Sequence, residues 1–189
     1  ERLNDALAEI QGRPADLIGR IRLGMPINFG NEHVLPVIAR FSALHPRVEF
    51  RLVYDFGSVL ERELLRGHLD FAIVDDVELH PKILKKPLYG ETLELCASQK
   101  HFKNLKKVDH PGSEIFKEIP FVDYQEGAPL VRRWFAHHFR AKKFPIHLKG
   151  VVMDVTGITR MVVGGMGAGI LPRYVAEEYV GRGLYRFRG

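Results

Sequence analysis

The stretch that decides the fold is GRIRLGMPINFGNEHVLPVIARFSALHPRVEFRLVY, residues 19–54. Apolar and polar residues alternate over residues 21–25 and again over residues 48–54, which is typical of β-strands. Between these two stretches the apolar residues from Val34 to Leu44 recur at helical spacing, after a predicted loop at residues 26–31. Two strands joined by a helix can pair in parallel, so the stretch predicts a parallel α/β unit.

The following residues extend this unit. Ser58 and Glu61 have the spacing of a capping box, which predicts a short helix that ends at Gly67. Residues 69–74 are almost continuously apolar, as expected for a strand covered on both faces of its sheet. The order strand, helix, strand, helix, strand therefore predicts an open parallel sheet with helices on its faces.

A looser version of the same pattern follows, and no low-complexity linker separates the two halves. The sequence thus predicts two α/β subdomains without a flexible joint. Strands are expected at residues 92–98, 120–124, 148–153 and 183–187, and residues 167–172 are expected to lead into another strand. Residues 99–112 are expected to be a basic, turn-rich connection. One expected helix carries Val131, Trp134, Phe135 and Phe139, a second carries Ile158, Met161 and Val162, and a third lies around residues 173–180.

Composition excludes several classes of protein. The chain of 189 residues is 46% hydrophobic and 27% charged, as is usual for globular proteins. Its apolar runs are much shorter than the roughly 20 residues of a membrane-spanning helix. The single cysteine, Cys96, excludes an internal disulfide and agrees with a reducing compartment. The net charge of +5 is carried by dispersed basic pairs, which do not form the stripe expected of a nucleic-acid groove.

No residue pattern predicts catalysis, a cofactor or a metal. The nine histidines form no ligand array, and Cys96 lies inside a predicted strand, as expected of a buried structural thiol. Ser58 and Ser113 precede predicted helices and are interpreted as caps. The glycine-rich residues 164–169 end a helix and open a strand, which is the reverse of a dinucleotide-binding loop. We therefore predict that the protein is not an enzyme.

Topology predicts a binding function. In open α/β sheets, ligands bind where the strands end and the helices begin. This rule selects the loops at residues 26–31, 55–58, 75–76 and 153–157. Short polar residues in these loops either cap helices or face a ligand, and both interpretations stay open for each of them: Asn28, Asn31, Ser58 and Thr156.

Several motifs, in order and with matching gaps, resemble the effector-binding domain of LysR-type transcriptional regulators. The first strand, with Val34-Leu35-Pro36 and His45-Pro46-x-Val48 after it, is similar to the start of that domain. Residues 67–73 resemble its Gly-x-Leu-Asp strand, and residues 162–172 resemble its late glycine-rich turn, which is the most specific single element. The resemblance covers roughly residues 18–188.

This resemblance implies an α/β fold of the type II periplasmic-binding-protein architecture, with a small-molecule effector in a cleft between two subdomains. Residues 1–17 would end a linker helix, residues 18–94 with 184–189 would form subdomain I, and residues 95–183 would form subdomain II. The chain stops before the final strand and helix that usually complete subdomain I. Carried over by position, the effector contacts would be Pro26, Ile27, Asn28, Phe29, Asn31, Gly57, Ser58, Asp75, Tyr124, Asp154, Val155 and Thr156. In the first loop, which is one residue longer than usual, Asn28 and Asn31 replace the common Ser or Thr.

The resemblance also implies a cytoplasmic homodimer or homotetramer with no membrane contact. DNA would be bound only by a winged helix-turn-helix N-terminal to this chain. An exported solute-binding protein of similar fold is the alternative. Helix N-termini and the positive net charge favour a carboxylate-bearing effector, whereas Asp55, Asp75 and Asp154 oppose one, so the effector's charge stays open.

Overall fold

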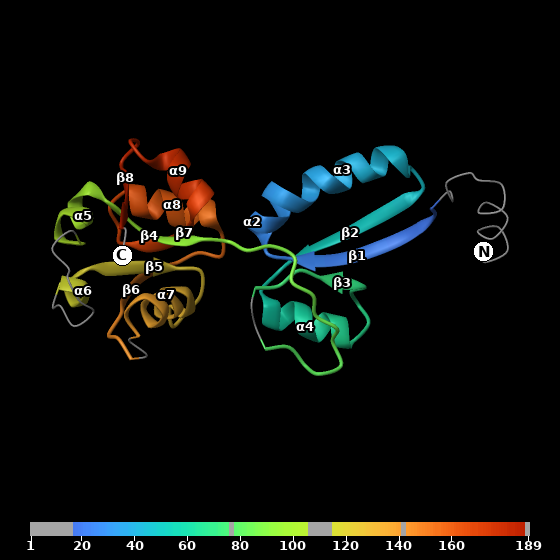
Figure 1. Ribbon diagram of the computed structural model, residues 1–189, viewed down its shortest axis with the longest axis horizontal. Coiled ribbons are helices and arrows are strands. Elements are labelled where there is room, and N and C mark those ends of the chain that lie inside the picture. Colours follow the sequence, from blue (N-terminus) through green and yellow to red (C-terminus); the bar gives the residue numbers. More distant parts are fainter. Residues whose placement is uncertain (1–16, 76–77, 106–114, 141–142, 188–189) are drawn as a thin grey trace. The chain divides into compact units, whose positions relative to one another are not determined.

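The computed structural model describes residues 17–75, 78–105, 115–140 and 143–187, so the predicted linker helix lies outside the described residues apart from Leu17. The chain divides into two compact units, unit 1 (Glu1–Pro87) and unit 2 (Leu88–Gly189). Figure 1 shows that each unit has helices on both sides of its strands.

Unit 1 is built on a parallel sheet with the strand order β2-β1-β3. Strands β1 and β2 pair in register along their whole length, from Gly19 opposite Val48 to Met25 opposite Tyr54. The strand–helix–strand prediction for residues 19–54 is therefore confirmed. The elements are β1 (Gly19–Met25), α2 (Ile27–Phe29), the π-helix η1 (Gly30–Val34), α3 (Leu35–Leu44), β2 (Val48–Tyr54), α4 (Gly57–Leu65) and β3 (Phe71–Ala72).

The alternation of side chains along β1 and β2 decides which helix covers which face. Phe41 of α3 packs edge-on against Phe50 of β2, with ring centroids 6.0 Å apart. On the opposite face, Leu60 of α4 lies so close to Gly24 that a Cβ atom there would come within 2.6 Å of the leucine Cδ2. The missing side chain at Gly24 thus allows α4 to pack directly on β1.

Three local predictions for unit 1 are wrong. Residues 26–31 are not a loop, because α2 and the start of η1 occupy residues 27–31 and only Pro26, the N-cap residue of α2, is extended. Ser58 does not cap α4, since that helix begins one residue earlier, with Phe56 at the N-cap position and no side-chain capping bond. The strand expected at residues 69–74 is reduced to Phe71–Ala72, and Phe71 is 64% exposed, so β3 is not covered on both faces.

Side-chain bonds hold this short strand against β1. The guanidinium of Arg22 donates to both carboxylate oxygens of Asp70, at 2.7 and 3.2 Å, and its Nη1 donates to the carbonyl of Gly67 at 2.7 Å. The backbone N–H of Arg22 also donates to Asp70, at 2.8 Å. These bonds to Arg22 hold the pKa of Asp70 below its usual value of 3.8.

Asp70→Asn should lower the stability of the protein at neutral pH and have less effect at low pH. The depressed pKa means that the stabilisation by ionised Asp70 is present above pH 3.8 and is lost as the pH falls through the folded-state value. Urea midpoints of both proteins, measured from pH 7 to pH 2.5, should therefore converge on acidification. A gap that stays constant with pH would contradict this account.

Unit 2 contains an antiparallel sheet of order β7-β4-β8 and a parallel pair, β5-β6. Its strand and helix predictions are confirmed in type and order except over residues 99–112. The elements are β4 (Leu93–Ser98), α5 (Gln99–Leu105), α6 (Ile115–Glu118), β5 (Pro120–Asp123), α7 (Pro129–Phe139), β6 (His147–Val151), α8 (Val155–Val163), β7 (Gly169–Pro172), α9 (Arg173–Tyr179) and β8 (Leu184–Phe187).

Two backbone hydrogen bonds join these sheets into one layer. Val122 donates to the carbonyl of Ala168 and Ala168 donates to that of Pro120, both at 2.8 Å. The approach requires Gly167, because a Cβ atom there would lie 2.5 Å from the Pro120 carbonyl oxygen. As predicted, the glycine-rich segment ends a helix and leads into a strand, with Gly165 in the left-handed region at φ +79°.

Alternating side chains divide the core of unit 2 between the two faces of this layer. Phe121 belongs to an aromatic cluster under α6 and α7, whereas its neighbour Val122 packs under α8 and α9. The aromatic cluster includes Phe116, Phe121, Trp134, Phe135 and Phe144, and the other cluster includes Cys96, Val122, Ile158, Val162, Leu171 and Leu184.

One prediction for unit 2 needs correction. Residues 99–105 form helix α5 and not a turn-rich connection, while the rest of that segment, with Ser113, lies outside the described residues. Residues 184–187 form β8, which pairs with β4 inside unit 2. Leu184 is 1% exposed in the core, and Arg186 pairs with Glu94 of β4 at 3.2 Å, which explains this placement. Unit 1 ends at Pro87 and unit 2 begins at Leu88, and the predicted subdomain boundary at residues 94 and 95 stays a prediction.

In the described parts of the chain, no helix is long and apolar enough to cross a lipid bilayer.

Gly167→Ala should destabilise the protein by roughly 1–3 kcal/mol, because the added methyl group must displace the backbone of Pro120. Gly90→Ala is the matched control, since a Cβ atom at Gly90 would meet nothing within 4 Å. Its stability should stay within about 0.5 kcal/mol of the parent protein. Urea unfolding followed by circular dichroism measures both, and equal effects would contradict the role given to Gly167.

Candidate functional site

The carboxyl ends of the strands of unit 1 lie along one edge of its sheet. Met25 ends β1 directly opposite Tyr54, the last residue of β2. The backbone N–H of Asp55 then donates to the carbonyl of Met25 at 3.3 Å. Helices α2 and α4 therefore both begin at this edge, which is where ligands bind in open α/β sheets.

This edge brings together the site residues that the sequence predicted in unit 1. Asn31, Ser58 and Asp75 are exposed. Asn31 is bonded within the unit, since its carboxamide oxygen accepts a hydrogen bond of 2.7 Å from the hydroxyl of Tyr54. The half-buried members are Pro26, Ile27, Asn28, Phe29 and Gly57.

In unit 2 the predicted site residues follow β5 and β6, whose ends also meet. The N–H of Val152 donates to the carbonyl of Asp123 at 3.1 Å across these strand ends. Asp154 is the N-cap of α8 and accepts bonds from the N–H groups of Thr156, at 2.9 Å, and Gly157, at 2.8 Å. The cap is thus Asp154 and not Thr156, whose side chain is exposed.

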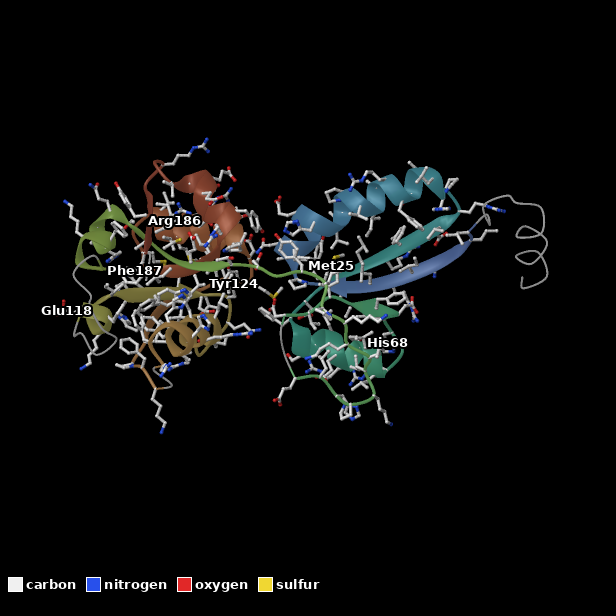
Figure 2. The ribbon with its side chains drawn as sticks, in the orientation of Figure 1. Met25, His68, Glu118, Tyr124, Arg186 and Phe187 are labelled. Atoms are coloured by element: carbon white, nitrogen blue, oxygen red, sulfur yellow. The ribbon has the colours of Figure 1, made fainter. Side chains whose placement is uncertain are left out.

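Tyr124 is held in position beside these strand ends (Figure 2). Its hydroxyl donates to the carbonyl of Ile170 in β7 at 3.3 Å. Burial raises the pKa of the phenol well above 10, and nearby acidic groups, with Glu91 first among them, raise it further. Tyr124 therefore acts as a neutral hydrogen-bonding group near neutral pH. Val155, another predicted contact, is only 6% exposed, so its side chain serves the core.

The sequence interpretation missed two residues at these edges, Tyr54 and Asp123. Asp123 is 1% exposed and accepts bonds from the backbone N–H groups of Tyr124, at 2.6 Å, and Val131, at 2.9 Å. Burial raises the pKa of this carboxyl group, and the amide bonds partly offset that effect. Both missed residues are the polar last residue of a strand, and that position was the available signal.

The polar groups at these edges are donors and acceptors of hydrogen bonds. Burial raises the pKa of Cys96 to about 12, so the thiol stays protonated, and the prediction of a structural cysteine is confirmed. Within the described residues, no group of three or more His, Cys, Asp and Glu side chains is arranged to hold a metal ion.

Comparison with known proteins gives a consistent result. Residues 14–188 match the sequence profile of the family described as LysR substrate binding domain. The transcriptional activator IlvY of Salmonella typhimurium is 26% identical over 168 residues, which are 86% of this chain and 55% of that protein. The chain thus spans about half the length of this curated relative.

Solved structures show the same fold. The effector binding domain of QuiR, solved in complex with shikimate, has a TM-score of 0.69 at 19% identity, over 90% of this chain and 80% of that one. The regulatory domain of MetR, a LysR family regulator from N. meningitidis, has a TM-score of 0.68 at 20% identity, over 90% and 78% of the two chains. These neighbours have the type II periplasmic-binding-protein fold, so the predicted fold class is confirmed.

Asp154→Ala should cost about 1 kcal/mol of stability, because it removes both capping bonds of α8. Asp154→Asn should retain most of the stability, since asparagine is an equally good N-cap. Thr156→Ala is the matched control two residues away and should change little. Thermal unfolding measures the three variants, and a larger loss for Thr156→Ala than for Asp154→Ala would overturn the cap assignment.

Proposed function

Because this chain belongs to the family of LysR substrate binding domains, we propose that it is the effector-sensing part of a DNA-binding transcription regulator. The family match over residues 14–188 is the observation that carries the proposal. The whole regulator would be longer than this chain, since the chain spans 55% of IlvY. DNA would be bound by a winged helix-turn-helix outside these residues.

The proposed effector contacts come from the strand-end edges of the two units. Unit 1 would contribute Asn31, with residues 26–29, 57–58 and Asp75 beside it. Unit 2 would contribute the hydroxyl of Tyr124, the carboxylate of Asp154, the exposed Thr156 and the backbone of Val155. Support comes from the polar groups at each edge, which face solvent or strand ends and form no catalytic pair.

Sensing would work through a difference in affinity. An effector can shift the regulator between two states only by binding one of them more tightly. The regulator would be a cytoplasmic homodimer or homotetramer. The alternative of an exported solute-binding protein finds no support among the relatives, since IlvY is described as a transcriptional activator.

A specific effector should raise the melting temperature of this chain. At 100 times its dissociation constant, a ligand stabilises the folded state by about 2.7 kcal/mol. At roughly 2–4 °C per kcal/mol, the shift should be about 5–11 °C. The test is a thermal-shift panel of organic acids, amino acids and their uncharged analogues, including shikimate. A folded protein that responds to none of a broad panel would contradict the sensing role.

Tyr124→Phe should weaken the binding of a compound found in this way, because it removes the hydroxyl that the carbonyl of Ile170 positions at the unit 2 edge. We expect an affinity loss of roughly five- to tenfold for one hydrogen bond. Isothermal titration measures it, with Tyr179→Phe as the control. Unchanged affinity in Tyr124→Phe would show that the contacts of unit 2 are assigned wrongly, even if the chain is a sensor.

A further inference from the structure

The most informative polar pair outside the predicted contacts is Tyr54 with Asn31 at the edge of unit 1. Tyr54 is the last residue of β2, and Asn31 lies in the π-helix η1. Their side chains meet through one bond, from the tyrosine hydroxyl to the carboxamide oxygen, at 2.7 Å. A π-helical turn is rare and is often found at functional sites.

The ring of Tyr54 is fixed by its surroundings. It packs against Gly30, where a Cβ atom would lie 2.7 Å from the tyrosine Cε1 and 2.9 Å from the sulfur of Met25. Because no side chain intervenes, the phenol reaches past Gly30 to the next residue. The position of the hydroxyl is thus set by the sheet and by the glycine.

This bond gives the carboxamide of Asn31 one orientation. The oxygen accepts from Tyr54, so the –NH₂ group points the other way, and it has no hydrogen-bond partner among the described residues. Asn31 is exposed, so both N–H bonds are available to a molecule at this edge.

We infer that Tyr54 is a positioning residue that turns the amide of Asn31 outward as a hydrogen-bond donor, so that this part of the site recognises an acceptor oxygen on the effector. The inference deepens the proposed function, on which its biological meaning rests. It assigns a chemical class to one end of the effector: a carbonyl, sulfoxide or carboxylate oxygen, and not an ammonium group.

The experiment uses small probes and the side-chain amide signals of ¹⁵N-labelled protein. Acetate is a charged acceptor, dimethyl sulfoxide is a neutral acceptor, and methylammonium is a donor. Acetate and dimethyl sulfoxide should shift the Asn31 –NH₂ signals in a saturable way, and methylammonium should not. The exposed side chain of Gln99, which no phenol orients, serves as the internal control and should not respond in this way.

Two variants test the role of the bond. Tyr54→Phe removes only the hydroxyl, so the acceptor probes should bind Asn31 at least threefold more weakly, whereas Tyr179→Phe should leave them unchanged. Asn31→Asp replaces the donor by a carboxylate at an exposed position. Backbone signals near residue 31 should then lose the response to acetate and gain one to methylammonium.

Several outcomes would overturn the inference. The Asn31 amide signals could respond to methylammonium alone, or to none of the three probes. The acceptor probes could also bind Tyr54→Phe as tightly as the parent protein. The result is separable from the proposed function. A panel compound that stabilises the protein without moving the Asn31 signals would refute this inference and leave the sensing role intact. Binding of the acceptor probes at Asn31, with no panel compound raising the melting temperature, would support this inference and contradict the sensing role.

Discussion

The close approach of Gly167 to Pro120 is the constraint on which unit 2 depends. It allows Ala168, which precedes β7, to accept a backbone hydrogen bond from Val122 and to donate one to Pro120, both in β5, and this joins two small sheets into one layer. The ends of β5 and β7 then become neighbours, and Tyr124 can bond to the carbonyl of Ile170. Backbone packing where the strands begin thus sets the geometry of polar groups where they end.

Unit 1 reaches the same arrangement by other means. Its buried hydrophobic residues among the described ones are few, namely Met25, Leu60 and Leu69. Polar bonds supplement this small core, since Arg22 and Asp70 tie the two-residue strand β3 to β1. Glycines at 24 and 30 let α4 and η1 lie directly on the strands. The edge of unit 1 is therefore ordered by close backbone packing more than by buried apolar area.

The sequence predicts what depends on neighbouring residues and misses what depends on distant ones. The alternation of apolar and polar residues over residues 48–54 is sufficient to predict β2, and the glycines at 164–169 are sufficient to predict the turn before β7. The helical turns at residues 26–31 were missed, because proline, asparagine and glycine favour a loop and only the contact of Gly30 with Tyr54 and Met25 shows otherwise. The pairing of β8 with β4 and the bond between Tyr54 and Asn31 join residues far apart in sequence. No local pattern contains that information.

The N-terminal amide groups of the helices are a further example of a feature that depends on contacts the sequence does not show. Helix N-termini favour a carboxylate only where their N–H groups are free. In unit 2, three of these N–H groups are occupied, since Asp154 accepts from Thr156 and Gly157 of α8, and Asp123 accepts from Val131 of α7. The negative charges of Glu91 and of these two carboxylates also raise the pKa of the Tyr124 phenol, beyond the larger effect of its burial. At the unit 2 edge, carboxylates of the chain itself therefore already use amide groups that the sequence analysis counted in favour of a carboxylate-bearing effector.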